Sequence, residues 1–130
     1  GYTIAAREKT VGQSRMDFIL HNHNAEEVFT EIKSVSLVEG KRALFPDEPT
    51  ERGSKHLREL IKLKGEKRKS AVVFIIQRED ADCFSPHDLQ DPVFGRTLRE
   101  AEKAGVNILA YKCRVSVEEI KVLAEVPVIL

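Results

Sequence analysis

The sequence predicts a mixed α/β (α+β) fold in which helices flank a mixed sheet. Segments with alternating apolar and polar residues indicate strands, and two segments with apolar residues three and four positions apart indicate helices. One almost wholly apolar segment is typical of a central strand that is covered on both faces. With 130 residues, 42% of them hydrophobic and 32% charged, the chain is long enough for a single globular domain, residues 1–130, with its own core.

The first part of the chain is predicted to form a β-hairpin or meander. Residues 2–8 are predicted to form a first strand, which ends before Gly12. Residues 14–20, SRMDFIL, alternate between apolar and polar side chains, which indicates a second strand. Residues 28–37, VFTEIKSVSL, follow a polar loop and return as the partner of the second strand. These two segments therefore lie side by side in the predicted sheet.

After a loop over residues 39–49, EGKRALFPDEP, a first helix is predicted over residues 50–65, TERGSKHLRELIKLKG. Leu57 and Leu60 belong to a single apolar stripe, while the outer surface of the helix is basic. Thr50 is suited to the N-cap and Gly65 to the end of the helix. The segment therefore has both a buried face and a charged face.

A second helix is predicted between Asp91 and Gly105. Asp91 is the expected N-cap, the first turn contains a proline, and Phe94 and Leu98 lie on the apolar stripe. Gly105 marks the exit from the helix. This helix separates two groups of strands.

The remaining segments are predicted strands. Residues 71–78, AVVFIIQR, form the central strand, and residues 107–115 and 120–130 form the last two. The predicted order is three strands, a helix, a strand, a helix and two strands.

The charge of the chain is unevenly distributed although its formal net charge is zero. Residues 52–69 contain eight basic and two acidic residues, whereas residues 76–102 contain three basic and seven acidic residues. Such a domain can attract a polyanion such as DNA to one side, although a charged run is also typical of a solvated helix face.

Other composition features limit the cellular setting. No apolar stretch approaches the roughly 20 residues of a membrane helix, so we expect no membrane partner. Cys83 and Cys113 lack the spacing of a metal site and are too few for a disulfide framework. This usage fits the reducing cytoplasm, and the sequence leaves the oligomeric state open.

Three charged residues predict a cation site in the hairpin. Glu31 and Lys33 lie two positions apart and share one face of their strand, and pairing of the hairpin would bring Asp17 near them. Two carboxylates repel unless a cation lies between them. Mg²⁺ or Mn²⁺ would be held by Asp17, Glu31 and the backbone carbonyl of Ile32. The alternative is an ordinary solvent-facing sheet surface, since the triplet EIK recurs at residues 119–121 without an Asp-bearing strand before it.

The same pattern resembles the PD-(D/E)XK nuclease superfamily. More specifically, residues 31–60, EIKSVSLVEGKRALFPDEPTERGSKHLREL, closely resemble the signature of the sugar fermentation stimulation protein family of bacteria and archaea. AVVFIIQREDADCFSP and GVNILAYKCRV resemble that family too. The resemblance implies a restriction-endonuclease-like mixed sheet flanked by helices, and an OB-like domain before it. Because the chain does not begin with Met, we expect it to be the C-terminal part of such a protein.

The resemblance implies roles for individual residues. Asp17 and Glu31 would be the acidic pair and Lys33 the active-site lysine, which would help the attacking water. Gln77 resembles the glutamine often found beside this superfamily's active site and would orient the water, or would only satisfy the end of a strand. His56 would be a phosphate contact, a proton shuttle or a structural histidine.

Nucleic-acid contacts are expected from basic residues of the hairpin and the first helix. Arg52 and Lys55 lie near the start of that helix, where free backbone N–H groups also favour anions. The full predicted set is Arg15, Arg52, Lys55, His56, Arg58 and Lys62.

Three functions remain open at this point. The first is a metal-dependent DNA nuclease, and the second is a non-catalytic DNA-binding regulator linked to sugar metabolism, as the family name implies. The third is an interaction module that binds no nucleic acid. We expect DNA binding without sharp sequence preference, since nothing resembles a helix-turn-helix or a base-reading finger.

Overall fold

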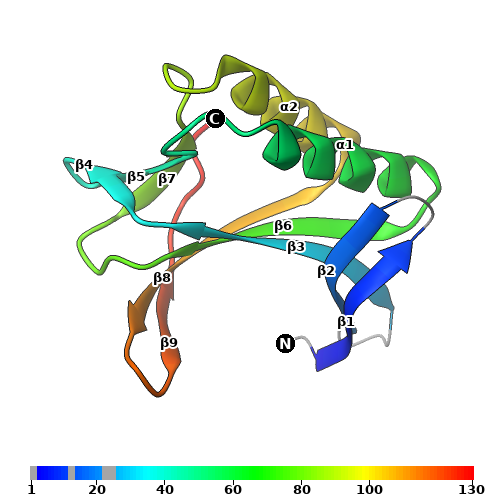
Figure 1. The fold of residues 1–130 in the computed structure, drawn as a ribbon, viewed down its shortest axis with the longest axis horizontal. Helices are drawn as coiled ribbons and strands as arrows, with labels where there is room; N and C mark the ends of the chain where they lie inside the picture. Colours follow the sequence, from blue (N-terminus) through cyan, green and yellow to red (C-terminus); the bar gives the residue numbers. More distant parts are fainter. Residues whose placement is uncertain (1–2, 12–13, 22–25) are drawn as a thin grey trace.

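Two sheets and a layer of helices make up the part of the chain that the structure describes (Figure 1). The computed structural model describes the backbone of residues 3–11, 14–21 and 26–130, and the side chains of residues 26–130 except Val115 and Ile120. The strands are β1 (Thr3–Val11), β2 (Ser14–His21), β3 (Glu27–Val35), β4 (Leu37–Glu39), β5 (Arg42–Phe45), β6 (Lys69–Ile76), β7 (Cys83–Pro86), β8 (Asn107–Val115) and β9 (Ile120–Glu125), and the helices are α1 (Glu51–Gly65) and α2 (Pro92–Ala104). The predicted mixed α/β class is confirmed.

The larger sheet is mixed and has the strand order β1-β2-β3-β6-β8-β9. Its three central strands, β3, β6 and β8, are parallel, and the outer strands join antiparallel. The pairing of Phe18 with Thr30 confirms the predicted hairpin between the second and third strands. The central strands are joined by α1 and α2, as crossover connections between parallel strands require.

The helices begin and end where local side chains satisfy the backbone. Thr50 caps α1 by accepting a hydrogen bond from the Gly53 N–H at 2.9 Å, and Asp91 caps α2 by accepting one from the Phe94 N–H at 3.0 Å. Gly105 has φ +96°, a left-handed conformation that favours glycine, and ends α2. These three predicted boundaries are confirmed.

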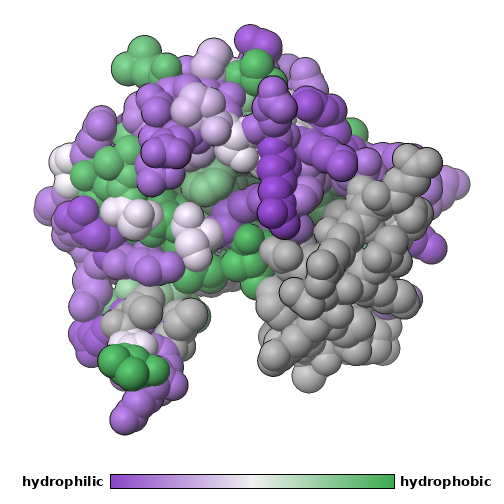
Figure 2. All heavy atoms as spheres, viewed as in Figure 1, coloured by the Kyte–Doolittle hydropathy of each residue, from purple (hydrophilic) through white to green (hydrophobic). Residues whose placement is uncertain are grey.

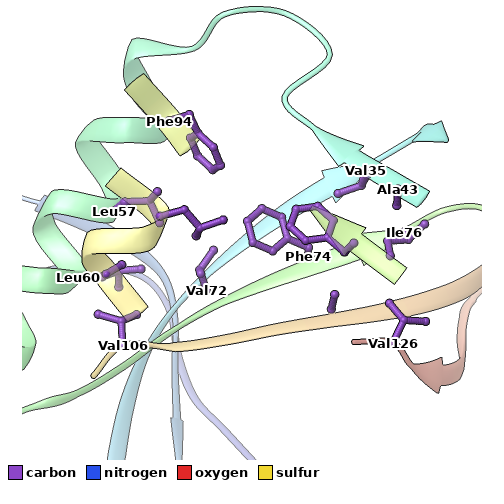
Figure 3. Packing of buried hydrophobic residues seen from close by; sticks show 14 of the residues in the cluster. Val35, Ala43, Leu57, Leu60, Val72, Phe74, Ile76, Phe94, Val106 and Val126 are labelled. Carbon is purple, nitrogen blue, oxygen red and sulfur yellow. The ribbon is translucent and has the colours of Figure 1, made fainter. Parts of the chain in front are cut away.

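The core lies between the helices and one face of the larger sheet (Figure 3). In β6, Val72, Phe74 and Ile76 all point into it and are fully buried. Phe74 stacks on Phe84 with ring centroids 4.2 Å apart. Since side chains alternate along a strand, Ala71, Val73 and Ile75 lie on the opposite face.

The second, three-stranded sheet differs from the sequence prediction. Residues 39–49 were expected to be a loop, but β4 and β5 pair antiparallel there, and β7 adds to β5 in parallel. Neither α1 nor α2, the helices of the described chain, is long and apolar enough to cross a membrane.

Candidate functional site

A cluster of Glu31, Lys33 and His56 lies between the larger sheet and α1. Glu31 and Lys33 point to the helical side of β3, and His56 reaches them from α1. The Oε1 atom of Glu31 is 2.8 Å from His56 Nδ1 and 3.2 Å from Lys33 Nζ. Lys33 Nζ and His56 Nδ1 are 2.9 Å apart. Three polar atoms from two elements therefore meet at one point.

The cluster is shielded from solvent. The exposed fractions of the side chains are 3% for Glu31, 12% for Lys33 and 15% for His56. A buried carboxylate is costly unless charged or hydrogen-bonding groups compensate it. Lys33 and His56 supply that compensation.

The proton arrangement in the cluster has two forms. If His56 Nδ1 is unprotonated, it accepts a hydrogen bond from Lys33, and if it is protonated, it donates one to Glu31. One ring nitrogen cannot do both at once. With the heavy atoms in the same positions, the proton at His56 Nδ1 can therefore belong either to Lys33, which donates it to the ring, or to His56, which donates it to Glu31.

The described part of the chain supplies one carboxylate to the predicted cation site. Phe18 pairs with Thr30, and the same antiparallel register continued by one residue would place the backbone of Asp17 opposite Glu31. The side chains of Asp17 and Arg15 lie outside the described residues. Among the side chains that are described, no group of three His, Cys, Asp or Glu residues is placed to hold a metal ion. The residues fit a cation only if Asp17 joins Glu31.

Two other predicted residues lie away from the cluster side chains. Ile32 lies between Glu31 and Lys33 in β3, and its side chain points to the opposite face of the sheet. Gln77 follows β6 and is exposed. Glu31 pairs with Val72 of β6. Gln77 lies five residues after Val72 and is therefore about 16 Å further along the strand direction. The structure does not bring Gln77 beside Glu31, because the central strand continues well past the acid.

The predicted basic residues of α1 are exposed. Lys55, Arg58 and Lys62 follow one another at helical spacing along one face, and Arg52 lies one turn before His56. Lys55 and Arg58 line a pocket of about 790 Å³ at the start of α1, which the acids Glu51 and Asp91 also line. The exposed basic face of α1 therefore borders the cluster through Arg52 and His56.

Two features of this region were missed in the sequence. His56 was not expected to contact Glu31, because the two residues are 25 positions apart and no spacing rule connects them. Asp91 was expected to cap α2 alone, but its second oxygen also accepts a hydrogen bond from the Thr50 N–H at 2.8 Å. A single carboxylate thus connects the starts of both helices.

Known proteins resemble this chain over almost all of its length. Residues 1–119 match the family described as the sugar fermentation stimulation protein RE domain. A sugar fermentation stimulation protein homolog of Moorella thermoacetica is 48% identical over 128 residues, which are 98% of this chain and 55% of that protein. A homolog of Caldanaerobacter subterraneus subsp. tengcongensis is 47% identical over 130 residues, which are 100% of this chain and 56% of that protein.

A solved structure has the same fold. It is described as the structure of Pyrococcus furiosus SfsA in complex with Ca²⁺, and it matches with a TM-score of 0.91 and 37% identity. The match covers 100% of this chain and 56% of the solved one. The chain thus spans about half the length of the curated relatives and of the solved structure that it matches.

Proposed function

Since the chain belongs to the sugar fermentation stimulation protein family, we propose that it binds DNA and hydrolyses its phosphodiester backbone with the help of a divalent cation. One observation carries the proposal. Glu31, a carboxylate buried on the helical side of the larger sheet, lies within 3.2 Å of both Lys33 and His56. Buried clusters of titratable groups beside a charged surface are typical of catalytic sites.

The cation is expected between Asp17 and Glu31. Carboxylate oxygens are the ligands that Mg²⁺ and Mn²⁺ prefer, and the carbonyl of Ile32 would add a third oxygen. The relative from Pyrococcus furiosus was solved with Ca²⁺, which also binds oxygen ligands. When bound, such a cation polarises a phosphoryl oxygen and makes a nearby water more acidic.

Lys33 and His56 have distinct roles in this proposal. Lys33 Nζ supplies a positive charge beside Glu31 and would stabilise charge that develops on a phosphate. His56 holds Glu31 in place when its Nδ1 is protonated, and it accepts from Lys33 when it is not. His56 is therefore both a positioning residue and a site that can hold a proton.

DNA would lie along the basic face of α1. The basic residues of this face, Arg52, Lys55, Arg58 and Lys62, are exposed. Arg52 lies one helical turn before His56. Phosphate contacts from such residues give affinity without reading sequence. The proposed partner is therefore DNA of any sequence.

A specific observation also favours the second candidate, a non-catalytic DNA-binding regulator. Lys33 and His56 already contact the Oε1 atom of Glu31 within the chain. The negative charge of Glu31 therefore has a compensating partner without a cation. This candidate keeps the basic face of α1 and assigns the cluster a structural role.

Cation titration separates the two candidates. Mn²⁺ binding is measured by calorimetry, and cleavage is measured on supercoiled plasmid, for the native chain, Glu31→Gln and Glu119→Gln. Glu119 begins the second copy of the EIK triplet and is exposed, so it is the matched control. We expect Glu31→Gln to weaken Mn²⁺ binding by at least about tenfold and to abolish cleavage, whereas Glu119→Gln changes neither.

Two results would contradict the catalytic proposal. If Glu31→Gln binds Mn²⁺ as tightly as the native chain, Glu31 is not a cation ligand. If the native chain binds DNA but neither Mn²⁺ nor Ca²⁺, the regulator is the correct assignment.

A further inference from the structure

The turn between α1 and β6 carries three consecutive basic residues, which we call the basic turn. They are Lys67, Arg68 and Lys69, and all three are exposed. Hydrophilic atoms reach the right-hand edge of the molecule in Figure 2, where Figure 1 shows this end of α1. The basic turn lines a pocket of about 230 Å³ together with Glu26, Glu27 and Phe29. Three cations share this pocket with two carboxylates, so its charge is positive overall.

Lys67 has a backbone conformation that favours glycine, with φ +62°. The Lys67 N–H donates to the Lys64 carbonyl and the Arg68 N–H donates to the Leu63 carbonyl, both at 3.0 Å. This pair of hydrogen bonds forms the motif with which many helices end, and glycine is the usual residue at the position of Lys67. The ending of the helix alone would therefore favour glycine. Lysine adds a positive charge at this position, and residues held at a conformational cost are common at functional sites.

Arg68 connects the basic turn to the strand that carries the cluster. Its Cζ atom lies 5.1 Å from the centroid of the Phe29 ring, a cation–π contact. Phe29 lies two residues before Glu31 in β3, so the two residues share one face of the sheet and their Cα atoms are about 7 Å apart. Stacking uses the face of the guanidinium and leaves the N–H groups in its plane available to a ligand. Arg68 is therefore placed beside the cluster, next to Glu31 along β3.

The cluster has a cation on each side of Glu31 along β3. Arg68 lies over Phe29, two residues before Glu31, and Lys33 lies two residues after it on the same face. A DNA strand carries one negative charge at every nucleotide. A strand that follows β3 across the cluster would therefore meet one cation before the buried carboxylate and another after it.

We propose that the basic turn, through Lys67 and Arg68, binds a backbone phosphate of the DNA strand that reaches the cluster. The proposal rests on the DNA binding proposed above, and it adds a contact at the C-terminal end of α1 to the basic face of that helix. Arg68 suits a phosphate because its planar N–H groups can donate two parallel hydrogen bonds. In the alternative, the cations only compensate the partial negative charge at the end of α1, and this alternative gives a different experimental result.

Substitution of Lys67 separates a DNA contact from a structural role. Lys67→Gly removes the charge and also the unfavourable conformation, so the variant keeps its ability to fold. Fluorescence anisotropy with duplex DNA is measured from low to moderate salt for the native chain, Lys67→Gly, Arg68→Gln and the control Lys103→Gln. Lys103 is an exposed lysine in the last turn of α2, so it matches Lys67 in charge and in its place at the end of a helix. Urea denaturation of each protein accompanies the series.

We expect Lys67→Gly and Arg68→Gln each to weaken DNA binding several-fold at low salt. Each should also reduce the slope of log affinity against log salt by about one, because one phosphate contact is lost. Lys103→Gln should change neither quantity. The urea midpoint of Lys67→Gly should be no lower than that of the native chain, since glycine suits the backbone there.

Three results would overturn the proposal. If Arg58→Gln reduces the slope but Lys67→Gly and Arg68→Gln do not, the basic turn binds no phosphate, while DNA binding along α1 stands. If Lys103→Gln reduces the slope as much as Lys67→Gly does, the effect belongs to net charge and not to the turn. If the native chain binds no DNA at any salt concentration, the proposed function fails and this contact fails with it.

Discussion

Glu31 connects two elements that are distant in the sequence. Its carboxylate lies in β3 but contacts His56 of α1, and Lys33 contacts both residues. The helix therefore cannot shift along the sheet without breaking polar contacts in a buried place, where they are costly to lose. At this scale, the atoms of the proposed site also hold α1 in place on the sheet.

A second ion pair, Asp88 with Arg99, gives a pH prediction. The two guanidinium nitrogens donate to the two carboxylate oxygens at 2.9 and 2.8 Å. The hydrogen bonds from Arg99 lower the pKa of Asp88, and burial opposes this shift in part. Because the folded pKa is depressed, the stabilisation is present above the unfolded pKa of about 3.9 and is lost as the pH falls through the folded pKa.

Asp88→Asn should therefore lower the free energy of unfolding by about 0.5 kcal/mol near neutral pH, the size typical of half-exposed pairs. The loss should shrink as the pH falls through the lowered pKa of folded Asp88 and disappear below it. Urea denaturation of both proteins across this range measures it, and Arg99→Gln should give the same loss near neutral pH. A difference that stays constant with pH would show that the pair does not carry the effect.

The sequence indicated part of this residue-level picture. The period of two along a strand correctly placed Glu31 and Lys33 on one face. Spacing could not reveal His56 as their partner, since packing of α1 on the sheet decides that contact. The distance of Gln77 from Glu31 along the sheet could not be predicted, because the end of a strand does not show how far it extends beyond a given residue of its neighbour.

At the scale of elements, Asp91 fixes the relation between α1 and α2. One oxygen accepts from the Thr50 N–H and the other from the Phe94 N–H. Gly95 lies nearby on α2, and a Cβ atom there would collide with the carboxylate of Asp88. The starts of both helices therefore depend on the carboxylate of Asp91, and the start of α2 also needs a residue without a side chain at position 95.

Asp91→Ala should destabilise the chain by about 2 kcal/mol, the upper end for a single cap, because two backbone donors lose an acceptor. Asp91→Asn keeps one acceptor oxygen and should cost less. Chemical denaturation measures both, with the exposed Asp82→Ala as the control. Equal stability of Asp91→Ala and Asp82→Ala would contradict the role of Asp91 in joining the helices.

Long periodic elements were predictable, and short ones were not. α1, α2 and β8 carry clear periodicity or caps, and their predicted bounds agree closely with the structure. β4, β5 and β7 have three or four residues each, too few to show a period. The glycine and prolines around them indicated a loop, but long-range pairing with β7 completes the small sheet.

At the scale of the whole molecule, the separation of charge gives a salt prediction. DNA affinity should fall steeply as salt rises, because phosphate contacts release counterions. Lys55→Gln and Arg58→Gln should each reduce the slope of log affinity against log salt by about one. Fluorescence anisotropy with duplex DNA of unrelated sequences measures this.

Lys41→Gln is the matched control for the salt series. Lys41 is exposed at the β4–β5 turn, away from α1, and its loss should leave the slope unchanged. An affinity that does not vary with salt would exclude the nucleic-acid proposal altogether.

The two faces of β3 have a consequence for how this chain can evolve. Its charged pair faces α1, while Ile32 and Thr30 face the opposite side of the larger sheet. Inserting or deleting one residue in the strand would exchange these faces, turning the acid and the base away from α1 and the isoleucine toward His56. Natural variation within β3 must therefore preserve the number of residues in the strand.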